Sequence, residues 1–238
     1  MNRILVALDV ETADEARALA TTLRGTVGGF KIGKRLFTSY GPDIVRELVG
    51  QGDRVFLDLK FHDIPNTVAG AVGAATRLGV WMVNVHASGG ATMMRAARAA
   101  ADEEAARMSK PAPLVIAVTV LTSLDQAALH EVGVPGDLRS QVERLAALTQ
   151  ASGLDGVVAS PQEIDIIRAG TGRHFAIVTP GIRSAGEVKG DQQRTLTAAQ
   201  AVAAGADFLV VGRPIIAAPD PRRAAERIVA ECAGAPSV

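Results

Sequence analysis

The stretch RVFLDLKFHDIPNT (residues 54–67) places two acidic residues and a lysine within six positions, directly after an apolar run. Val, Phe and Leu at 55–57 are typical of a buried β-strand, and Pro65 lies where the first turn of a following helix would begin. Charged groups are costly to bury unless they are paired. The stretch therefore indicates a buried strand whose carboxyl end carries a charged site, followed by a helix.

The same succession of a short apolar run and a longer Ala- and Leu-rich segment recurs along the whole chain. Near-continuous apolar strands separated by helices indicate parallel strands that are covered on both faces. We expect strands over residues 3–10, 29–33, 54–60, 81–87, 113–121, 156–160, 175–181 and 207–212. We expect helices over residues 13–24, 42–51, 68–78, 90–108, 138–152, 161–169, 197–204 and 221–231.

About eight βα pairs in a chain of 238 residues favour an α/β fold of the closed (β/α)₈ type, a TIM barrel, as a single domain over residues 1–238. The main alternative is an open, doubly wound sheet. That fold often carries a Gly-rich turn after its first strand, whereas LDVET (8–12) follows here. We expect residues 123–137 to form a long, mobile loop and the last few residues to be frayed.

Composition and charge argue against several classes of protein. The 25 basic and 25 acidic residues give a formal net charge of zero, unlike that of a nucleic-acid-binding protein. No apolar run is long enough to span a membrane, and the N-terminus does not resemble a signal peptide. The single cysteine, Cys232, cannot form an internal disulfide, which favours a reducing compartment. We therefore expect a cytoplasmic protein that binds neither nucleic acid nor membrane.

Charged residues are expected at one end of the barrel, because active sites of this fold lie at the carboxyl ends of the strands. Asp58 and Lys60 should point the same way, since side chains alternate along a strand. Asp9 and Lys31 come from the two preceding strands. An interleaved set of this kind keeps each group ionised and can supply a proton. The alternative is a structural network of ion pairs without catalysis.

A phosphate site is expected after the last two strands, where TPGIR (179–183) and VVGRPI (210–215) occur. The loops at this place in a TIM barrel often hold phosphate. Gly212 lets the backbone approach a ligand closely, and Arg213 can bind a dianion through two hydrogen bonds. GDQQR (190–194) could fold over the ligand. The alternative is a glycine turn beside a solvated arginine.

These motifs together resemble the orotidine 5′-phosphate decarboxylase family. FLDLKFHDIPNT (56–67) looks like the signature of that family, and the resemblance covers essentially the whole chain. The Asp-x-Lys-x-x-Asp core is shared with a wider group of phosphosugar barrels, but the full ordered set is specific. The other matching stretches are LDV (8–10), FKIG (30–33), VNVHASGG (83–90), LTS (121–123), TPGIR (179–183) and VGRPI (211–215).

The resemblance implies a cofactor-independent and metal-independent decarboxylation of orotidine 5′-monophosphate to uridine 5′-monophosphate and CO₂, in de novo pyrimidine biosynthesis. It implies that Lys60 protonates C6 of the pyrimidine and that Asp58 lies near the departing carboxylate. It also implies a homodimer in which Asp63 and Thr67 reach the active site of the second subunit. The remaining implied contacts are Lys31 with the ribose and Asp58, Asp9 with the ribose, Thr122 with the base, and Arg183, Gln192, Gly212 and Arg213 with the phosphate region.

Two alternatives to this function stay open. One is a metal-using decarboxylase of a sugar-acid phosphate, built on the same barrel and the same Asp-x-Lys-x-x-Asp. That enzyme is expected to carry an acid where this chain has Lys31, and a lysine there disfavours Mg²⁺. The other is a catalytically silent protein that binds a phosphorylated ligand, although the intact charged set argues against it.

Overall fold

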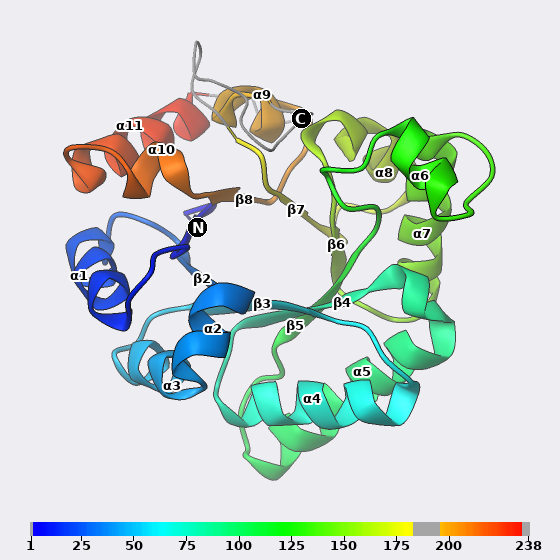
Figure 1. The fold of residues 1–238 in the computed structure, drawn as a ribbon, viewed down its shortest axis with the longest axis horizontal. Helices are drawn as coiled ribbons and strands as arrows, with labels where there is room; N and C mark the ends of the chain where they lie inside the picture. Colours follow the sequence, from blue (N-terminus) through cyan, green and yellow to red (C-terminus); the bar gives the residue numbers. More distant parts are fainter. Residues whose placement is uncertain (1, 183–195, 235–238) are drawn as a thin grey trace.

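The computed structural model describes residues 2–182 and 196–234, which form a closed barrel of eight parallel strands. Each strand pairs with the next along the chain, and β8 pairs with β1 (Figure 1). The strands are β1 (Ile4–Ala7), β2 (Gly29–Gly33), β3 (Val55–Phe61), β4 (Met82–His86), β5 (Leu114–Val118), β6 (Gly156–Val158), β7 (Ala176–Thr179) and β8 (Phe208–Val211). The expected (β/α)₈ barrel is confirmed, and the open sheet is excluded.

Helices surround the barrel and cover the outer faces of its strands (Figure 1). Polar caps set where several of them begin: Thr12 and Glu15 form a capping box at α1, and Asp137 accepts from the N–H of Ser140 at α7. The helices are α1 (Ala13–Leu23), α2 (Lys34–Tyr40), α3 (Asp43–Gly50), α4 (Pro65–Arg77), α5 (Gly90–Arg107), α6 (Gln126–Glu131), α7 (Leu138–Ala151), α8 (Ile164–Gly170), α9 (Ala198–Ala203), α10 (Arg213–Ile216) and α11 (Pro221–Ala233), with 3₁₀ turns η1 (Ala87–Gly89) and η2 (Pro161–Glu163).

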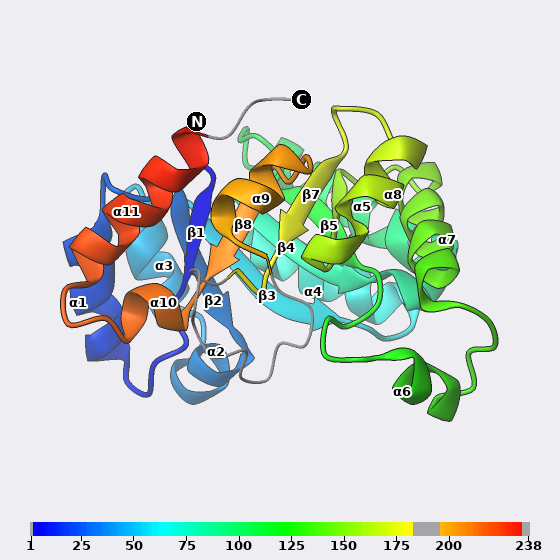
Figure 2. The same cartoon turned by 90° about the horizontal axis from the view of Figure 1, so that it is seen from above.

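All eight expected strands occur, with ends that differ from the expected ones by at most three residues. The expectation of a plain loop over 123–137 is wrong, because this segment contains α6. Asp125 caps that helix by accepting from the N–H of Ala128, and the Gln126 amide donates to the carbonyl of Gly136. Figure 2 shows α6 and α2 toward the end of the barrel at which the strand arrows point. Helices this short carry no amphipathic repeat that a sequence pattern would reveal.

Hydrophobic side chains form two buried clusters, one inside the barrel and one between the strands and the helices. Phe56 belongs to the inner cluster and Leu57 to the outer one. Since side chains alternate along a strand, Asp58 is directed to the inner face, above the inner cluster. The inner cluster comprises Leu5, Phe56, Met82, Ile116, Val118, Val158 and Val178.

The described elements belong to one barrel domain. None of the helices within residues 2–182 and 196–234 combines the length and the apolar composition needed to cross a bilayer. Residues 235–238, part of the tail that we expect to be frayed, lie outside the described residues.

Candidate active site

A cavity of about 540 Å³ opens at the carboxyl ends of the strands. One part of its wall carries the four charged residues expected from β1 to β3, and another part carries Gly181, Gly212 and Arg213. Aliphatic side chains such as Val158 and Ile216 line the space between them. The cavity therefore combines an ionic region, an apolar region and a basic region in one chamber. The charged residues are Asp9, Lys31, Asp58 and Lys60.

The four charges alternate in sign, as expected. Lys31 Nζ lies 3.0 Å from Asp9 Oδ1 and 3.6 Å from Asp58 Oδ2. Lys60 Nζ lies 2.6 Å from Asp58 Oδ1. Asp58 thus stands between two ammonium groups, and Lys31 stands between two carboxylates. We call these residues the charged array.

Burial differs along the charged array. Only 8% of the Lys31 side chain and 12% of the Asp58 side chain are exposed, compared with 52% for Asp9. Burial by itself raises the pKa of Asp58, but the charges of Lys31 and Lys60 and the hydrogen bonds from Lys60 and Asn84 outweigh it. The pKa of Asp58 is therefore lowered, and its carboxylate stays ionised in a partly dry site.

The main chain of β3 is irregular at the charged array. Lys60 has a φ of 55°, in the left-handed region that residues other than glycine rarely adopt, and the pairing of β3 with β4 shifts between Leu57 and Phe61. A β-bulge of this kind re-aims a side chain. The alternation of side chains along a strand therefore explains why Asp58 is directed to the inner face of the barrel. It does not explain how Lys60 Nζ reaches the Asp58 carboxylate.

Two residues that the sequence analysis did not select support the charged array. Asn84, which is fully buried on β4, donates from Nδ2 to Asp58 Oδ1 at 2.7 Å. Gly33 leaves room for Lys31, because a Cβ at this position would lie 2.9 Å from Lys31 Nζ and 3.1 Å from Asp9 Oδ1. The polar amide of Asn84 inside the apolar run VNV (83–85) is the feature of the sequence that could have identified it.

His62 and His86 stack beside the site, with ring centroids 5.3 Å apart. The pKa of His86 is lowered to about 4, chiefly by burial and in addition by the nearby His62, Lys60 and Lys34. His86 is thus neutral near pH 7. Neither histidine is among the residues that line the cavity.

The lowered pKa of His86 predicts how stability depends on pH. The unfolded chain binds a proton on this histidine near pH 6.5, and the folded chain only near pH 4, so acid favours unfolding within that window. We expect the free energy of unfolding to fall as the pH drops from 6.5 to 4, and less steeply in His86→Gln. Urea titrations at several pH values measure this, with the exposed His174→Gln as the control. If the free energy of unfolding depends on pH equally in wild type and in His86→Gln, the lowered pKa of His86 is contradicted.

The other expected site residues fall into three groups. Thr122, Gly212 and Arg213 line the cavity, so the structure brings them to the charged array. Asp63 and Thr67 are exposed and do not line the cavity of their own chain. Arg183 and Gln192 lie outside the described residues.

Comparison with known proteins places these features in a family. The sequence model described as Orotidine 5′-phosphate decarboxylase / HUMPS family matches residues 2–228. The chain is 55% identical over 231 residues to the orotidine 5′-phosphate decarboxylase of Moorella thermoacetica, covering 97% of this chain and 92% of the relative. It is also 55% identical over 233 residues to that of Halorhodospira halophila, covering 98% and 97% of the two chains.

Solved structures show the same likeness. The crystal structure of orotidine 5′-phosphate decarboxylase from Lactobacillus acidophilus superposes with a TM-score of 0.86 at 35% identity, covering 98% of this chain and 99% of the other. The corresponding enzyme from Pyrococcus horikoshii superposes with a TM-score of 0.78 at 28% identity, covering 97% and 99%. The likeness thus extends over the whole barrel.

Proposed function

The chain belongs to the orotidine 5′-phosphate decarboxylase family and has the carboxy-lyase activity of that enzyme, and we propose that Lys60 supplies the proton that replaces the departing carboxylate. In this reaction the bond between C6 and the carboxylate carbon breaks, and its electron pair stays on C6. A C–H bond then forms with a proton from Lys60 Nζ. The products are uridine 5′-monophosphate and CO₂.

The charged array is the observation that supports this mechanism. Loss of CO₂ leaves a vinyl-type carbanion with no adjacent carbonyl to take the charge, so a cation fixed at the carbon must stabilise it. The ammonium of Lys60, held 2.6 Å from Asp58 Oδ1, is preorganised for this task. Asp58 would lie near the substrate carboxylate and add repulsion in the ground state. Lys31 and Asp9 would hold the ribose.

The same array argues against the metal-using alternative. The carboxylate of Asp58 is already contacted by Lys31, Lys60 and Asn84, and a Mg²⁺ ion there would have to displace at least one ammonium group. Lys31 also occupies the position at which that alternative enzyme is expected to carry an acid. The described residues contain no group of three or more His, Cys, Asp or Glu side chains that could hold a metal ion.

An ultraviolet assay that follows the loss of orotidine 5′-phosphate tests the function directly. We expect the purified protein to consume this substrate at an unchanged rate in the presence of EDTA. Loss of activity in EDTA would favour the metal-using decarboxylase. Binding of uridine 5′-monophosphate without any turnover would favour the silent binding protein.

We assign the phosphate of the substrate to the basic part of the cavity wall. Arg213 begins α10 directly after Gly212, and both line the cavity. Remote binding energy from the phosphate can be used at the reacting carbon. Arg183 and Gln192 are proposed to join them on the resemblance alone, because they lie outside the described residues. Thr122 is proposed to contact the base.

Arg213→Ala should mainly weaken the binding of phosphorylated ligands. The loss of one charge-assisted contact to a dianion predicts a Kd for uridine 5′-monophosphate that rises by roughly 10- to 100-fold. The Kd for uridine, which has no phosphate, should stay unchanged. Calorimetric titration of both ligands measures this difference, with the exposed Arg222→Ala on α11 as the control. An unchanged affinity for uridine 5′-monophosphate would contradict the assignment.

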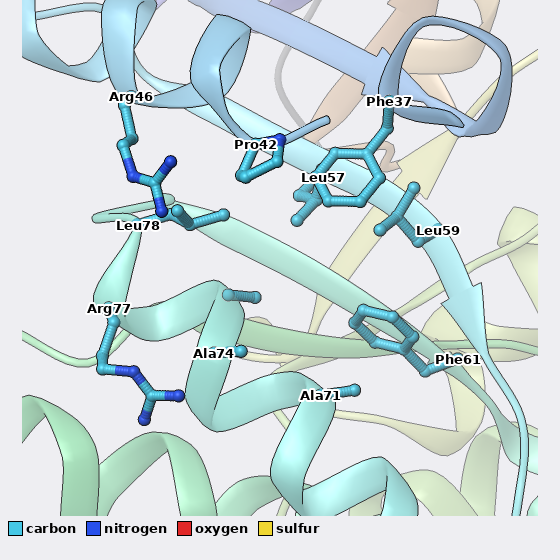
Figure 3. A pocket seen from close by; sticks show the side chains of 11 residues that line it. Phe37, Pro42, Arg46, Leu57, Leu59, Phe61, Ala71, Ala74, Arg77 and Leu78 are labelled. Carbon is cyan, nitrogen blue, oxygen red and sulfur yellow. The ribbon is translucent and has the colours of Figure 1, made fainter. Parts of the chain in front are cut away.

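We further propose a homodimer in which Asp63 and Thr67 enter the active site of the second subunit. Both side chains are exposed on this chain, beside Ile64, which is 66% exposed. An apolar groove of about 520 Å³ lies close by, between α2–α3 and α4, and includes Leu59 and Phe61 of β3 (Figure 3). A second copy of the chain would cover this groove and bring Asp63 to a neighbouring cavity.

The compartment and the remaining partners are also proposals. The family's place in pyrimidine biosynthesis and the single cysteine favour the cytoplasm. The balanced charge disfavours nucleic acid as a partner. The small-molecule nucleotide is therefore the partner that we assign to the cavity, without a cofactor or a metal.

A further inference from the structure

We propose that Asn84 is a positioning residue for the decarboxylation, one that aligns the carboxylate of Asp58 and the main chain of Lys60 with a single side chain. This inference rests on the function proposed above. Asn84 does not line the cavity and is not expected to touch the substrate. It would act through the two residues that do.

Both ends of the Asn84 amide are used. Its Nδ2 donates to Asp58 Oδ1 at 2.7 Å, the same oxygen that accepts from Lys60 Nζ at 2.6 Å. Its Oδ1 accepts from the backbone N–H of Lys60 at 2.8 Å. The amide therefore connects the carboxylate and the main chain of the lysine that pairs with it. The three residues form a closed ring of hydrogen bonds.

The bulge in β3 explains why this connection is needed. Leu57 pairs with Val83 and Phe61 with Val85, so residues 58–60 of β3 lie opposite the single residue 84 of β4. Extra residues in a bulge interrupt the regular ladder between strands. The N–H of Lys60 uses the side-chain oxygen of Asn84 as its acceptor. Asn84 thus completes the hydrogen bonding of the bulge that re-aims Lys60.

The left-handed conformation of Lys60 makes this support important. A φ of 55° at a residue other than glycine persists only where the surroundings hold it. Asn84 is fully buried, so removal of its amide would leave the Lys60 N–H without this acceptor and Asp58 without one donor. The ammonium of Lys60 could then move relative to the reacting carbon. A displacement of about 1 Å can cost on the order of 100-fold in rate.

Two variants test the proposal, each with its rate expressed per binding site. Asn84→Ala removes both ends of the amide. Asn84→Asp is nearly isosteric and keeps an acceptor for Lys60 N–H, but replaces the donor to Asp58 with a carboxylate. The matched control is Thr119→Val, which removes a buried hydroxyl just beyond the end of β5 that donates to the carbonyl of Val158 and not to the charged array.

We expect kcat to fall by roughly 100-fold in Asn84→Ala and at least as far in Asn84→Asp. The number of sites titrated by uridine 5′-monophosphate and their Kd should stay within about threefold of wild type, because the phosphate and ribose contacts do not involve Asn84. Thr119→Val should keep the wild-type kcat. A role in folding alone would lower the number of titratable sites and leave kcat per site unchanged.

Other results would overturn the proposal. One is a kcat per site within about threefold of wild type in either variant that folds. The other is failure of both variants to fold at 20 °C, which would show that Asn84 is needed for the stability of the barrel. Failure of the proposed function is a separate outcome: the wild-type protein would then bind uridine 5′-monophosphate without consuming orotidine 5′-phosphate. An active wild type with unaffected variants would refute the role of Asn84 alone.

Discussion

Lys60→Ala should lower the turnover of orotidine 5′-phosphate by at least about 10⁴-fold while the barrel stays folded. Under the proposed mechanism, the variant loses both the cation that stabilises the carbanion and the proton donor. The fold should survive because Asp58 keeps two partners, Lys31 and Asn84. The ultraviolet assay gives the rate, and circular dichroism with thermal unfolding reports the fold.

Two further variants separate the proton donor from the charge. Lys60→Arg keeps a cation beside Asp58, but a guanidinium does not release its proton near pH 7, so we expect this variant to be nearly as inactive. Lys110→Ala, an exposed lysine between α5 and β5, is the control and should keep full activity. Activity near the wild-type level in Lys60→Ala would refute the assignment of the proton donor.

Mixing two inactive variants should restore activity if Asp63 works across a dimer. We expect Asp63→Ala and Lys60→Ala each to be inactive alone. In a mixed dimer, one cavity carries both defects and the other carries neither. Random exchange of subunits makes about half of the dimers mixed, so activity should recover to about a quarter of the wild-type level.

The design of the mixing experiment distinguishes the dimer from a role within one chain. The two proteins are combined after brief exposure to low denaturant, and activity is followed over time as the subunits exchange. Asp58→Ala mixed with Lys60→Ala is the control, because each of these residues is placed in the cavity of its own chain. That pair should not recover, because each cavity of a mixed dimer still carries one of the two defects. No recovery with Asp63→Ala, in a mixture in which labelled chains show that the subunits have exchanged, would place Asp63 in the site of its own subunit.

The barrel could be predicted from the sequence because each strand is a short apolar run that a polar residue ends. The ionic part of the site followed from the same argument: buried charges require partners, and Asp58 and Lys60 can meet Lys31 and Asp9 only at one end of a closed barrel. The fold class and the charged array thus depend on strong and simple energetic terms. The family resemblance then assigned chemistry to them.

The features that sequence analysis missed depend on geometry with no simple pattern. The bulge at Lys60 changes the pairing of β3 with β4, and no residue pattern in VFLDLKF (55–61) predicts it. Asn84 becomes important only because that bulge brings a backbone N–H opposite it. The helix α6 is too short to show a repeat. The roles given to Asp63 and Thr67 stay predictions, since they depend on a second chain.

The close approach of Lys31 to Gly33 has a consequence for how this site can change. Gly33 has a φ of −94°, which any amino acid can adopt, so its backbone alone does not require glycine. The constraint is spatial: the ammonium of Lys31 occupies volume beside the Cα that a methyl group would need. A methyl group at position 33 would displace this ammonium, which lies at the end of a flexible side chain, and would disturb its ion pairs with Asp9 and Asp58. We therefore expect substitutions at positions 33 and 31 to be non-additive in their effect on activity, as is usual for residues in direct contact.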